Sequence, residues 1–321
     1  VPMIALPGEA VSIDELLTLN DAVLEPVYPT KAGTAETVAP ISWDKRSIAV
    51  CKHKAAHPKA VIPVFPGTNC EYDSARACLR AGLEPEIVVV RNLTASALEE
   101  STLALEKAIR AAQILFLSGG FSGGDEPDGS AKFITAFFRA PEVTEAVRDL
   151  LKARDGLMLG ICNGFQALIK LGLVPFGEIR DTDAACPTLT YNVIGRHQSK
   201  IVRTRVVSNR SPWLSGVNAG DVFAIPVSHG EGRFVADDAA LRRLIENGQI
   251  ATQYTTPCGK VSGDITWNPN GSVCGIEGIT SPDGRVFGKM AHSERRGDSV
   301  AVNIYGEQDM KIFESGVAYF K

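Results

Sequence analysis

Short apolar runs alternate with amphipathic stretches along most of the chain from Lys59 onward. Four runs, each bounded by polar residues or glycine, predict buried strands at residues 60–65, 86–91, 113–117 and 156–161. Between them, apolar positions at helical spacing predict helices at residues 69–82, 94–112, 130–139 and 142–153, the second with Thr94 as a plausible cap. This alternation predicts right-handed βαβ crossovers and an α/β fold whose sheet is doubly wound, mostly parallel and flavodoxin-like.

The pattern changes after about residue 180, where regular strand and helix alternation ends. Asn270-Gly271 and Asp283-Gly284 are typical of tight turns between antiparallel strands. We therefore expect an antiparallel segment added to the parallel sheet within the same domain. Loops at the carboxyl ends of the parallel strands are the expected place for a functional site.

Residues 1–58 differ from the rest, because they carry scattered prolines and no sustained apolar period. Ser12 and Glu15 match a capping box and predict one short helix there. We interpret 1–58 as a connector that lies against the main body, and 59–321 as a single domain. The first residue is Val1 rather than methionine, which indicates processing or excision from a longer chain.

Composition narrows the possible functions. The 321 residues are 45% hydrophobic and 22% charged, which is typical of a globular protein. A net charge of −4 with no long basic run argues against nucleic acid and anionic membranes as partners. No apolar run reaches the ~18 residues of a membrane helix. Seven cysteines without a CxxC pair predict free thiols in a reducing compartment, with no metal site.

One cysteine lies where a nucleophile is expected. Gly160-Ile161-Cys162-Asn163-Gly164 joins a predicted strand to a predicted helix, and a sharp turn of this kind needs small neighbours. The first N–H groups of that helix favour the thiolate form of Cys162. A small buried hydrophobe is the alternative interpretation of Cys162. The two flanking glycines favour the nucleophile.

Attack on an acyl carbon also needs hydrogen-bond donors for the developing oxyanion. One candidate is the N–H of Asn163, directly after the nucleophile. Another is the loop 118–126, where Gly119 and Gly120 allow backbone N–H groups to approach a ligand. A flexible turn is the alternative interpretation of this loop. A phosphate loop is a poor match, since the consensus is absent and acidic residues at 125, 126 and 128 repel phosphate.

Two histidines carry a glutamate two residues later, in His229-Gly230-Glu231 and His292-Ser293-Glu294. In an extended backbone, residues i and i+2 share a face, so each glutamate can orient its own histidine. His292 ends the last strand-like run. Glycines flank Glu231 and leave the orientation of its side chain less fixed. We favour His292 as the base and Glu294 as its orienting partner, and place His229 on the rim of the site. Spacing alone does not settle this choice.

The motifs GICNGFQ, SGGFSGGDE, PVSHGEGRF and a late HSER together resemble those of class I glutamine amidotransferases. The resemblance is greatest to the glutaminase part of formylglycinamidine ribonucleotide synthases and extends from about Lys59 to the C-terminus. It implies that Cys162 attacks the side-chain amide of L-glutamine, with His292 and Glu294 as acid, base and orienter. Ser293 departs from the family's usual proline at this position.

The same resemblance implies further roles for residues near the cysteine. Gly120 and Asn163 correspond to the oxyanion hole, with Gly119 beside it. Gln166 would lie beside the bound glutamine. The residue before Gln166 is a phenylalanine here, a second departure from the family pattern.

The function implied is hydrolysis of L-glutamine through a cysteine thioester. The ammonia would serve the ATP-dependent conversion of formylglycinamide ribonucleotide to formylglycinamidine ribonucleotide in purine biosynthesis. The expected partner is a synthetase region of the same parent chain, reached by an ammonia tunnel, which holds ATP and Mg. No cofactor or metal is expected in this domain, and the expected location is the cytoplasm.

Two other classes remain open at the level of sequence. One is a cysteine hydrolase of the same superfamily, such as a protease or deglycase. Those enzymes usually have a histidine directly after the nucleophile, where this chain has Asn163. The other is a binding module with a degenerate, non-catalytic site.

Overall fold

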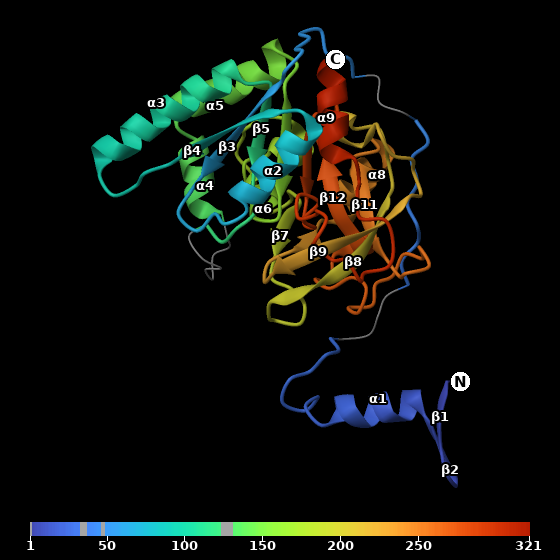
Figure 1. The fold of residues 1–321 in the computed structure, drawn as a ribbon. Helices are drawn as coiled ribbons and strands as arrows, with labels where there is room; N and C mark the ends of the chain where they lie inside the picture. The colour runs from blue at the N-terminus through green and yellow to red at the C-terminus, as the bar shows by residue number, and fades with distance from the viewer. Residues whose placement is uncertain (1, 33–36, 46–48, 123–130) are drawn as a thin grey trace. The chain divides into compact units, whose positions relative to one another are not determined.

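The computed structural model describes residues 2–32, 37–45, 49–122 and 131–321 (Figure 1). The chain divides into two compact units, Val1–Thr34 and Ala35–Lys321, each of which is described by itself. The acidic residues at 125, 126 and 128, which the sequence analysis used to argue against a phosphate loop, lie outside the described residues.

The first unit is a small hairpin followed by a helix. Its elements are β1 (Met3–Leu6), β2 (Glu9–Ser12) and α1 (Ile13–Ala22). The helix predicted after Ser12 is confirmed, but the Ser12 side chain makes no capping hydrogen bond. No residue of α1 is buried.

The described residues of 37–58 pack within the second unit. The N–H of Trp43 donates to the Val207 carbonyl at 3.1 Å, and that of Ala55 donates to the Phe320 carbonyl at 3.0 Å. Cys51 is fully buried in the core. The sequence boundary between residues 58 and 59 stays a prediction.

A nine-stranded mixed sheet forms the centre of the second unit, in the order β4-β3-β5-β6-β13-β12-β11-β8-β9. The bounds of these strands are β3 (Lys59–Val64), β4 (Glu84–Val89), β5 (Ile114–Leu117), β6 (Leu157–Ile161), β8 (Gln198–Val206), β9 (Val222–His229), β11 (Ile250–Thr255), β12 (Ile276–Thr280) and β13 (Val286–Lys289). Strands β4, β3, β5, β6 and β13 are parallel, and the pairs from β13 to β9 are antiparallel. The mixed sheet confirms the predicted fold class.

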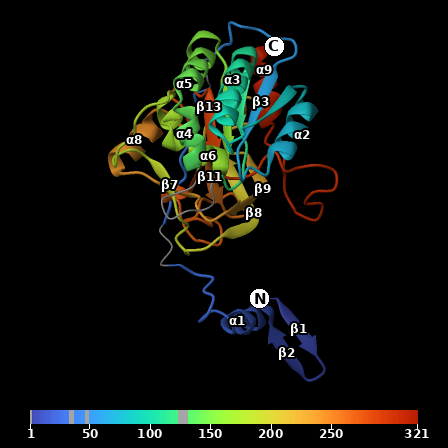
Figure 2. The same cartoon turned by 90° about the vertical axis from the view of Figure 1, so that its left-hand side faces the viewer.

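Helices cover both faces of the sheet. Those of the second unit are α2 (Glu71–Ala81), α3 (Ala95–Ala111), α4 (Lys132–Phe138), α5 (Pro141–Arg148), α6 (Asn163–Lys170), α7 (Leu173–Phe176), α8 (Asp238–Glu246) and α9 (Ile312–Phe320). Helices α2 and α9 pack on one face, while α3, α4, α5 and α6 lie on the other (Figure 2). This double cover explains why β5 and β6 are entirely buried.

Shorter elements complete the second unit. A π-helical turn (Asp149–Ala153) extends α5, and 3-10 turns occupy Pro212–Leu214 and Val273–Gly275. Strands β7 (Thr188–Thr190) and β10 (Arg233–Val235) form a separate antiparallel pair. None of the described helices is both long and apolar enough to cross a membrane.

One of the two predicted hairpin turns is confirmed and the other is wrong. Asp283-Gly284 joins the antiparallel strands β12 and β13, with Gly284 at a φ of +75°. Asn270-Gly271 lies in the long segment between the antiparallel neighbours β11 and β12, at a turn in which the Gly271 N–H donates to the Asn268 carbonyl at 3.0 Å, so it is not a tight hairpin turn between these strands. Instead Asn270 is fully buried, and its side chain donates to the Gly232 carbonyl at 2.6 Å and to the Tyr254 hydroxyl at 3.0 Å. The asparagine ties two distant loops together, which local turn chemistry does not reveal.

Helix α3 allows a test of its predicted cap. The Thr94 hydroxyl accepts a hydrogen bond from the Ala97 N–H at 3.1 Å. We expect Thr94→Ala to lower the free energy of unfolding by about 1 kcal/mol, measured by urea denaturation, because one helix-terminal N–H loses its partner. Thr94→Ser should be close to wild type. Equal stability of the alanine and serine variants would contradict this role.

Candidate active site

Cys162 lies at the turn between β6 and α6, at the carboxyl end of a central parallel strand. Its φ is +53° and its ψ is −108°, a conformation that residues other than glycine rarely adopt. A Cβ at Gly164 would overlap the Leu117 carbonyl oxygen, and one at Gly160 would lie 2.7 Å from the Gly164 carbonyl oxygen. The predicted need for small residues on both sides of Cys162 is therefore confirmed.

Two hydrogen bonds fix the nucleophile candidate in this turn. The N–H of Cys162 donates to the Lys289 carbonyl on β13 at 2.8 Å. Its thiol points toward the Ser228 carbonyl on β9, 3.8 Å away. The side chain is only 3% exposed. Helix α6 starts at the next residue, so Cys162 lies at the N-terminal end of the helix.

His292 and Glu294 follow β13 and form a buried pair. The His292 Nδ1 lies 2.6 Å from the Glu294 Oε1. Burial lowers the pKa of His292, but the Glu294 charge and the interaction with Cys162 outweigh it and raise the pKa well above its usual value. Because Cys162 is among the groups that raise the pKa of His292, its side chain lies near the imidazole. The fold thus brings together the three residues that the sequence analysis predicted as catalytic.

The backbone around Ser293 is a turn, not the extended segment on which the pairing was predicted. The N–H of Ser293 donates to the Ala291 carbonyl at 3.1 Å, and the N–H of Arg295 donates to the His292 carbonyl at 3.2 Å. The Ser293 hydroxyl donates to the Met310 sulfur at 3.4 Å. The turn still brings the side chains of His292 and Glu294 together. A proline at 293 would have no N–H for the first of these bonds.

The loop after β5 lies directly against this pair. A Cβ at Gly119 would come within 2.7 Å of the His292 ring, so only glycine fits without displacing the imidazole. Gly120 has a φ of +150° and forms an isolated bridge with Thr68. The side chain of Asn163 accepts a hydrogen bond from the Ser122 N–H at 3.2 Å. The two predicted oxyanion sources are therefore neighbours, and their role stays a prediction.

Gln166 lies on the first turn of α6 and is nearly fully buried. Its side-chain oxygen accepts a hydrogen bond from the Asn163 side chain at 2.8 Å, and its amide donates to the Glu231 carbonyl at 2.5 Å. Gln166 thus connects the cysteine turn to the loop after β9. That it also lies beside a bound glutamine stays a prediction.

The predicted position of His229 on the rim is wrong. His229 is 1% exposed, and neither ring nitrogen has a hydrogen-bond partner among the described residues. Burial, followed by the charges of His292 and His197, lowers its pKa to about 3, so the ring is neutral at physiological pH. The loop that follows packs tightly on the ring, since a Cβ at Gly232 would lie 2.5 Å from it. This long-range packing is invisible in the spacing of the motif.

Two further residues touch the pair and were missed from the sequence. The Cys70 sulfur lies 4.0 Å from the His292 Nδ1 and accepts a hydrogen bond from the Arg295 guanidinium at 3.0 Å. Cys70 directly precedes α2, and the neighbouring backbone N–H groups of Asn69 and Cys70 donate to the Gly119 carbonyl. One sequence signal could have indicated Cys70: it follows the predicted strand 60–65, so it is expected at the carboxyl ends of the strands, as Gly119 is.

Cys70, His292 and Glu294 also offer three possible metal ligands, whose ligand atoms lie within 4.8 Å of one another. The arrangement suits hydrogen bonding better than metal binding. The His292 Nδ1 is engaged by Glu294 at 2.6 Å, too close for two ligands of one tetrahedral ion, and the cationic Arg295 already donates to the Cys70 sulfur.

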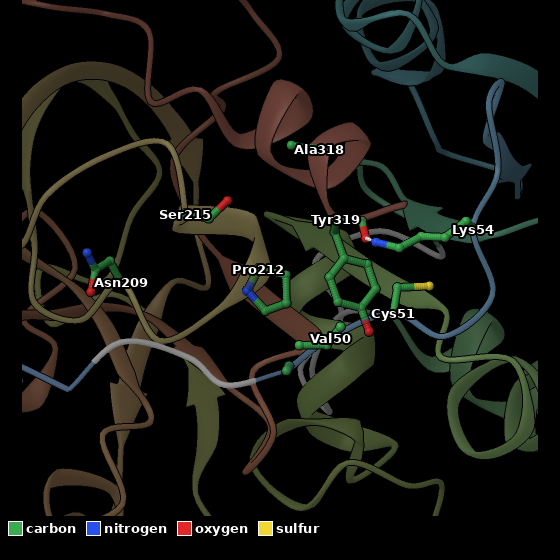
Figure 3. Close-up of a pocket in the computed structure, with 9 residues that line it drawn as sticks. Val50, Cys51, Lys54, Asn209, Pro212, Ser215, Ala318 and Tyr319 are labelled. Atoms are coloured by element: carbon green, nitrogen blue, oxygen red, sulfur yellow. Dashed lines mark hydrogen bonds between the residues drawn. The ribbon is translucent and has the colours of Figure 1, made fainter. Parts of the chain in front are cut away.

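A cavity of about 340 Å³ lies away from these residues and is lined in part by Cys51, Lys54, Pro212 and Tyr319 (Figure 3). The neighbouring Lys52 N–H donates to Asp155, which precedes β6, whereas Cys162 follows β6. The cavity is therefore near the amino ends of the parallel strands, whereas Cys162 lies at their carboxyl ends. None of the predicted site residues lines it.

Comparison with known proteins decides the family. The family model for the CobB/CobQ-like glutamine amidotransferase domain matches residues 57–320. The chain belongs to this family of glutamine amidotransferases. The match covers the cysteine turn, the loop after β5 and the His292–Glu294 pair of the amidotransferase domain.

Individual relatives of the amidotransferase domain carry a more specific name. Phosphoribosylformylglycinamidine synthase subunit PurQ of Gloeobacter violaceus is 34% identical over 263 residues, which is 81% of this chain and 97% of the relative. The PurQ subunit of Symbiobacterium thermophilum is 37% identical over 242 residues, covering 74% and 88%. Among solved structures, PurLQS from Thermotoga maritima matches with a TM-score of 0.57 and 28% identity, covering 83% of this chain and 100% of that one.

The charge of Glu294 can be tested through His292. Because Glu294 raises the pKa of His292, we expect Glu294→Gln to lower it, as measured by NMR titration of the ring. The stability that protonated His292 contributes is present at low pH and lost as the pH rises through its folded-state pKa. Because this loss ends at the folded-state pKa, it should be smaller in the variant and complete at a lower pH.

The same variant should slow the reaction of Cys162 with iodoacetamide at neutral pH roughly 10-fold, because an imidazole without its charged partner is less often protonated and stabilises the thiolate less. Glu314→Gln is a matched control, since Glu314 pairs with Arg296 at 2.9 Å nearer the surface. A Glu294→Gln variant with wild-type titration and alkylation would rule out the orienting role.

Proposed function

We propose that this amidotransferase domain hydrolyses L-glutamine to glutamate and ammonia as the glutaminase component of a phosphoribosylformylglycinamidine synthase. The observation that carries the proposal is the strained Cys162 beside the buried His292–Glu294 pair. The specific reaction rests on similarity to PurQ subunits, which extends over nearly their full length. The protease, deglycase and binding-module alternatives have no comparable support.

In the proposed mechanism, the Cys162 thiolate attacks the side-chain amide carbon of glutamine. Glu294 holds the Nδ1 of His292, which leaves the Nε2 as the nitrogen that exchanges protons with the reacting groups. The imidazolium then gives its proton to the leaving nitrogen, ammonia departs, and a thioester to Cys162 remains. Water, deprotonated by His292, attacks the thioester carbon and releases glutamate and the free thiol.

The tetrahedral intermediates of both steps carry negative charge on the former amide oxygen. We assign its stabilisation to the N–H of Asn163 and to the Gly119–Gly120 backbone. The Ser122 N–H bond to the Asn163 side chain supports this assignment, because it holds the two segments in a fixed arrangement. Preformed donors need no reorganisation during the reaction, which is the main advantage of such a site.

The ammonia produced needs an electrophile that this chain does not supply. We propose that a synthetase component holds ATP and Mg, activates formylglycinamide ribonucleotide and receives the ammonia through a tunnel. The name of the Thermotoga maritima structure, PurLQS, supports a multicomponent assembly for that relative. We propose that the protein acts in the cytoplasm, which a role in purine biosynthesis supports.

A glutamine-analogue diazoketone tests the nucleophile. We expect it to modify Cys162 in the wild-type protein and to abolish glutamine hydrolysis, with peptide mapping to locate the adduct. Cys162→Ala should have no measurable glutaminase activity. Cys258→Ser is the control, because Cys258 is exposed and distant in the sequence from every site residue. Modification of Cys70 or Cys258 in place of Cys162 would contradict the proposal.

Glutamine turnover with and without the synthetase component tests the coupling. We expect glutaminase activity to rise at least about fivefold when the synthetase component and its substrates are present, since coupled sites typically differ by this much or more. Heat-denatured synthetase is the control. Equal turnover under both conditions would leave hydrolysis intact but refute the coupling.

A further inference from the structure

A buried ion pair lies next to the site without a place in the mechanism above. The Lys289 ammonium on β13 is 3.3 Å from the Glu277 carboxylate on β12, and both side chains are completely buried. Burying two opposite charges gains little stability, because the loss of hydration offsets their attraction. Burial lowers the pKa of Lys289, and the Glu277 charge opposes that shift.

Both members of the pair form hydrogen bonds with the backbone of Ala291, the residue that precedes His292. The Glu277 Oε1 accepts a hydrogen bond from the Ala291 N–H at 2.7 Å. The Lys289 ammonium donates to the Ala291 carbonyl at 2.6 Å. The other carboxylate oxygen of Glu277 accepts a hydrogen bond from the Thr252 hydroxyl on β11. The start of the His292 turn is thus fixed to two strands by charged groups.

The same lysine also contacts the nucleophile, through its main chain. Its carbonyl accepts the Cys162 N–H at 2.8 Å, next to the parallel pairing of Lys289 with Ile161. Lys289 therefore holds the segment of the base with its side chain and the segment of the nucleophile with its backbone. Lys289 is therefore hydrogen-bonded to the segments of both reacting residues.

We propose that the Glu277–Lys289 pair is a positioning device that sets the separation and angle between Cys162 and His292. This inference rests on the proposed function, because it assumes that these two residues react together. Neither member of the pair contacts the substrate in the proposed mechanism, so both are positioning residues. By anchoring Ala291, the pair opposes displacement of the following turn, which carries both His292 and Glu294.

Several charged or titratable groups face the pair from neighbouring elements. Glu294 interacts with Lys289 through charge from the turn after β13, and Tyr254 interacts with Glu277 from β11. Cys162 in turn affects both Tyr254 and His292. The pair is therefore connected electrostatically to the reacting groups as well as by hydrogen bonds.

The test is the double variant Glu277→Gln/Lys289→Met, which removes both charges but keeps similar volumes. A glutamine can still accept from the Ala291 N–H, whereas a methionine cannot donate to its carbonyl. We expect kcat for glutamine hydrolysis to fall roughly 10- to 100-fold, because a small misplacement of reacting groups has this effect. The KM for glutamine should stay within about twofold, since no substrate contact is removed.

The pH dependence of alkylation by iodoacetamide gives a second readout. In the double variant we expect the pH midpoint of Cys162 alkylation to rise, because the thiolate has a less well placed imidazolium. This measurement needs no glutamine turnover. A wild-type protein without glutaminase activity would refute the proposed function, whereas the alkylation profiles would still decide the positioning role.

Asp155→Asn is the matched control. Asp155 and Arg285 lie 3.4 Å apart near the starts of β6 and β13, at the opposite ends of the same two strands from Cys162 and His292. We expect this variant to lose stability but to keep its kcat and alkylation midpoint. Wild-type kcat and midpoint in a folded double variant would overturn the proposal.

A milder variant covers the case in which the double variant does not fold. Thr252→Val removes one hydrogen bond to Glu277 and leaves both charges in place. We expect a smaller fall in kcat, with KM unchanged and the alkylation midpoint shifted in the same direction. A folded Thr252→Val protein with wild-type kcat and midpoint would also overturn the proposal.

Discussion

The parallel pairing of β6 with β13 is the constraint on which the site depends. It places the strand that ends at Cys162 beside the strand that leads to His292, in the register Ile161 to Lys289. Cys162 and His292 are far apart in the sequence, and this strand pairing brings them together. The antiparallel strands β12, β11, β8 and β9 then extend the sheet from β13, and Ser228 and His229 reach the site from its far edge.

Contacts around Cys162 offset the cost of its strained backbone conformation. A non-glycine residue with φ of +53° and ψ of −108° costs of order 1–3 kcal/mol, which the surrounding contacts must offset. The tight approach of Gly164 to Leu117 and the hydrogen bond from Cys162 to Lys289 are such contacts. The resulting turn directs the sulfur toward the Ser228 carbonyl on β9 and places it near the His292 ring.

Sequence reasoning succeeded where structure is local or periodic. The parallel strands, the Thr94 cap, the glycines around Cys162 and the Asp283-Gly284 turn all follow from short-range rules. It failed where the burial or the hydrogen bonds of a side chain depend on contacts across the fold. The buried Asn270, the buried His229 and the contact of Cys70 with Arg295 join segments far apart in the chain. No spacing rule encodes such contacts, because they depend on which strands become neighbours.

The register of β6 against β13 has a consequence for the folding of the protein. Side chains alternate between faces along a strand, so a shift of one residue would turn the side chains of β13 to the opposite face relative to β6 and move the turn after β13 by about 3.3 Å relative to Cys162. Such a molecule would keep most of its secondary structure yet separate its sulfur from its imidazole. Catalytic competence therefore reports the fidelity of strand alignment more sensitively than spectroscopic helix or sheet content does.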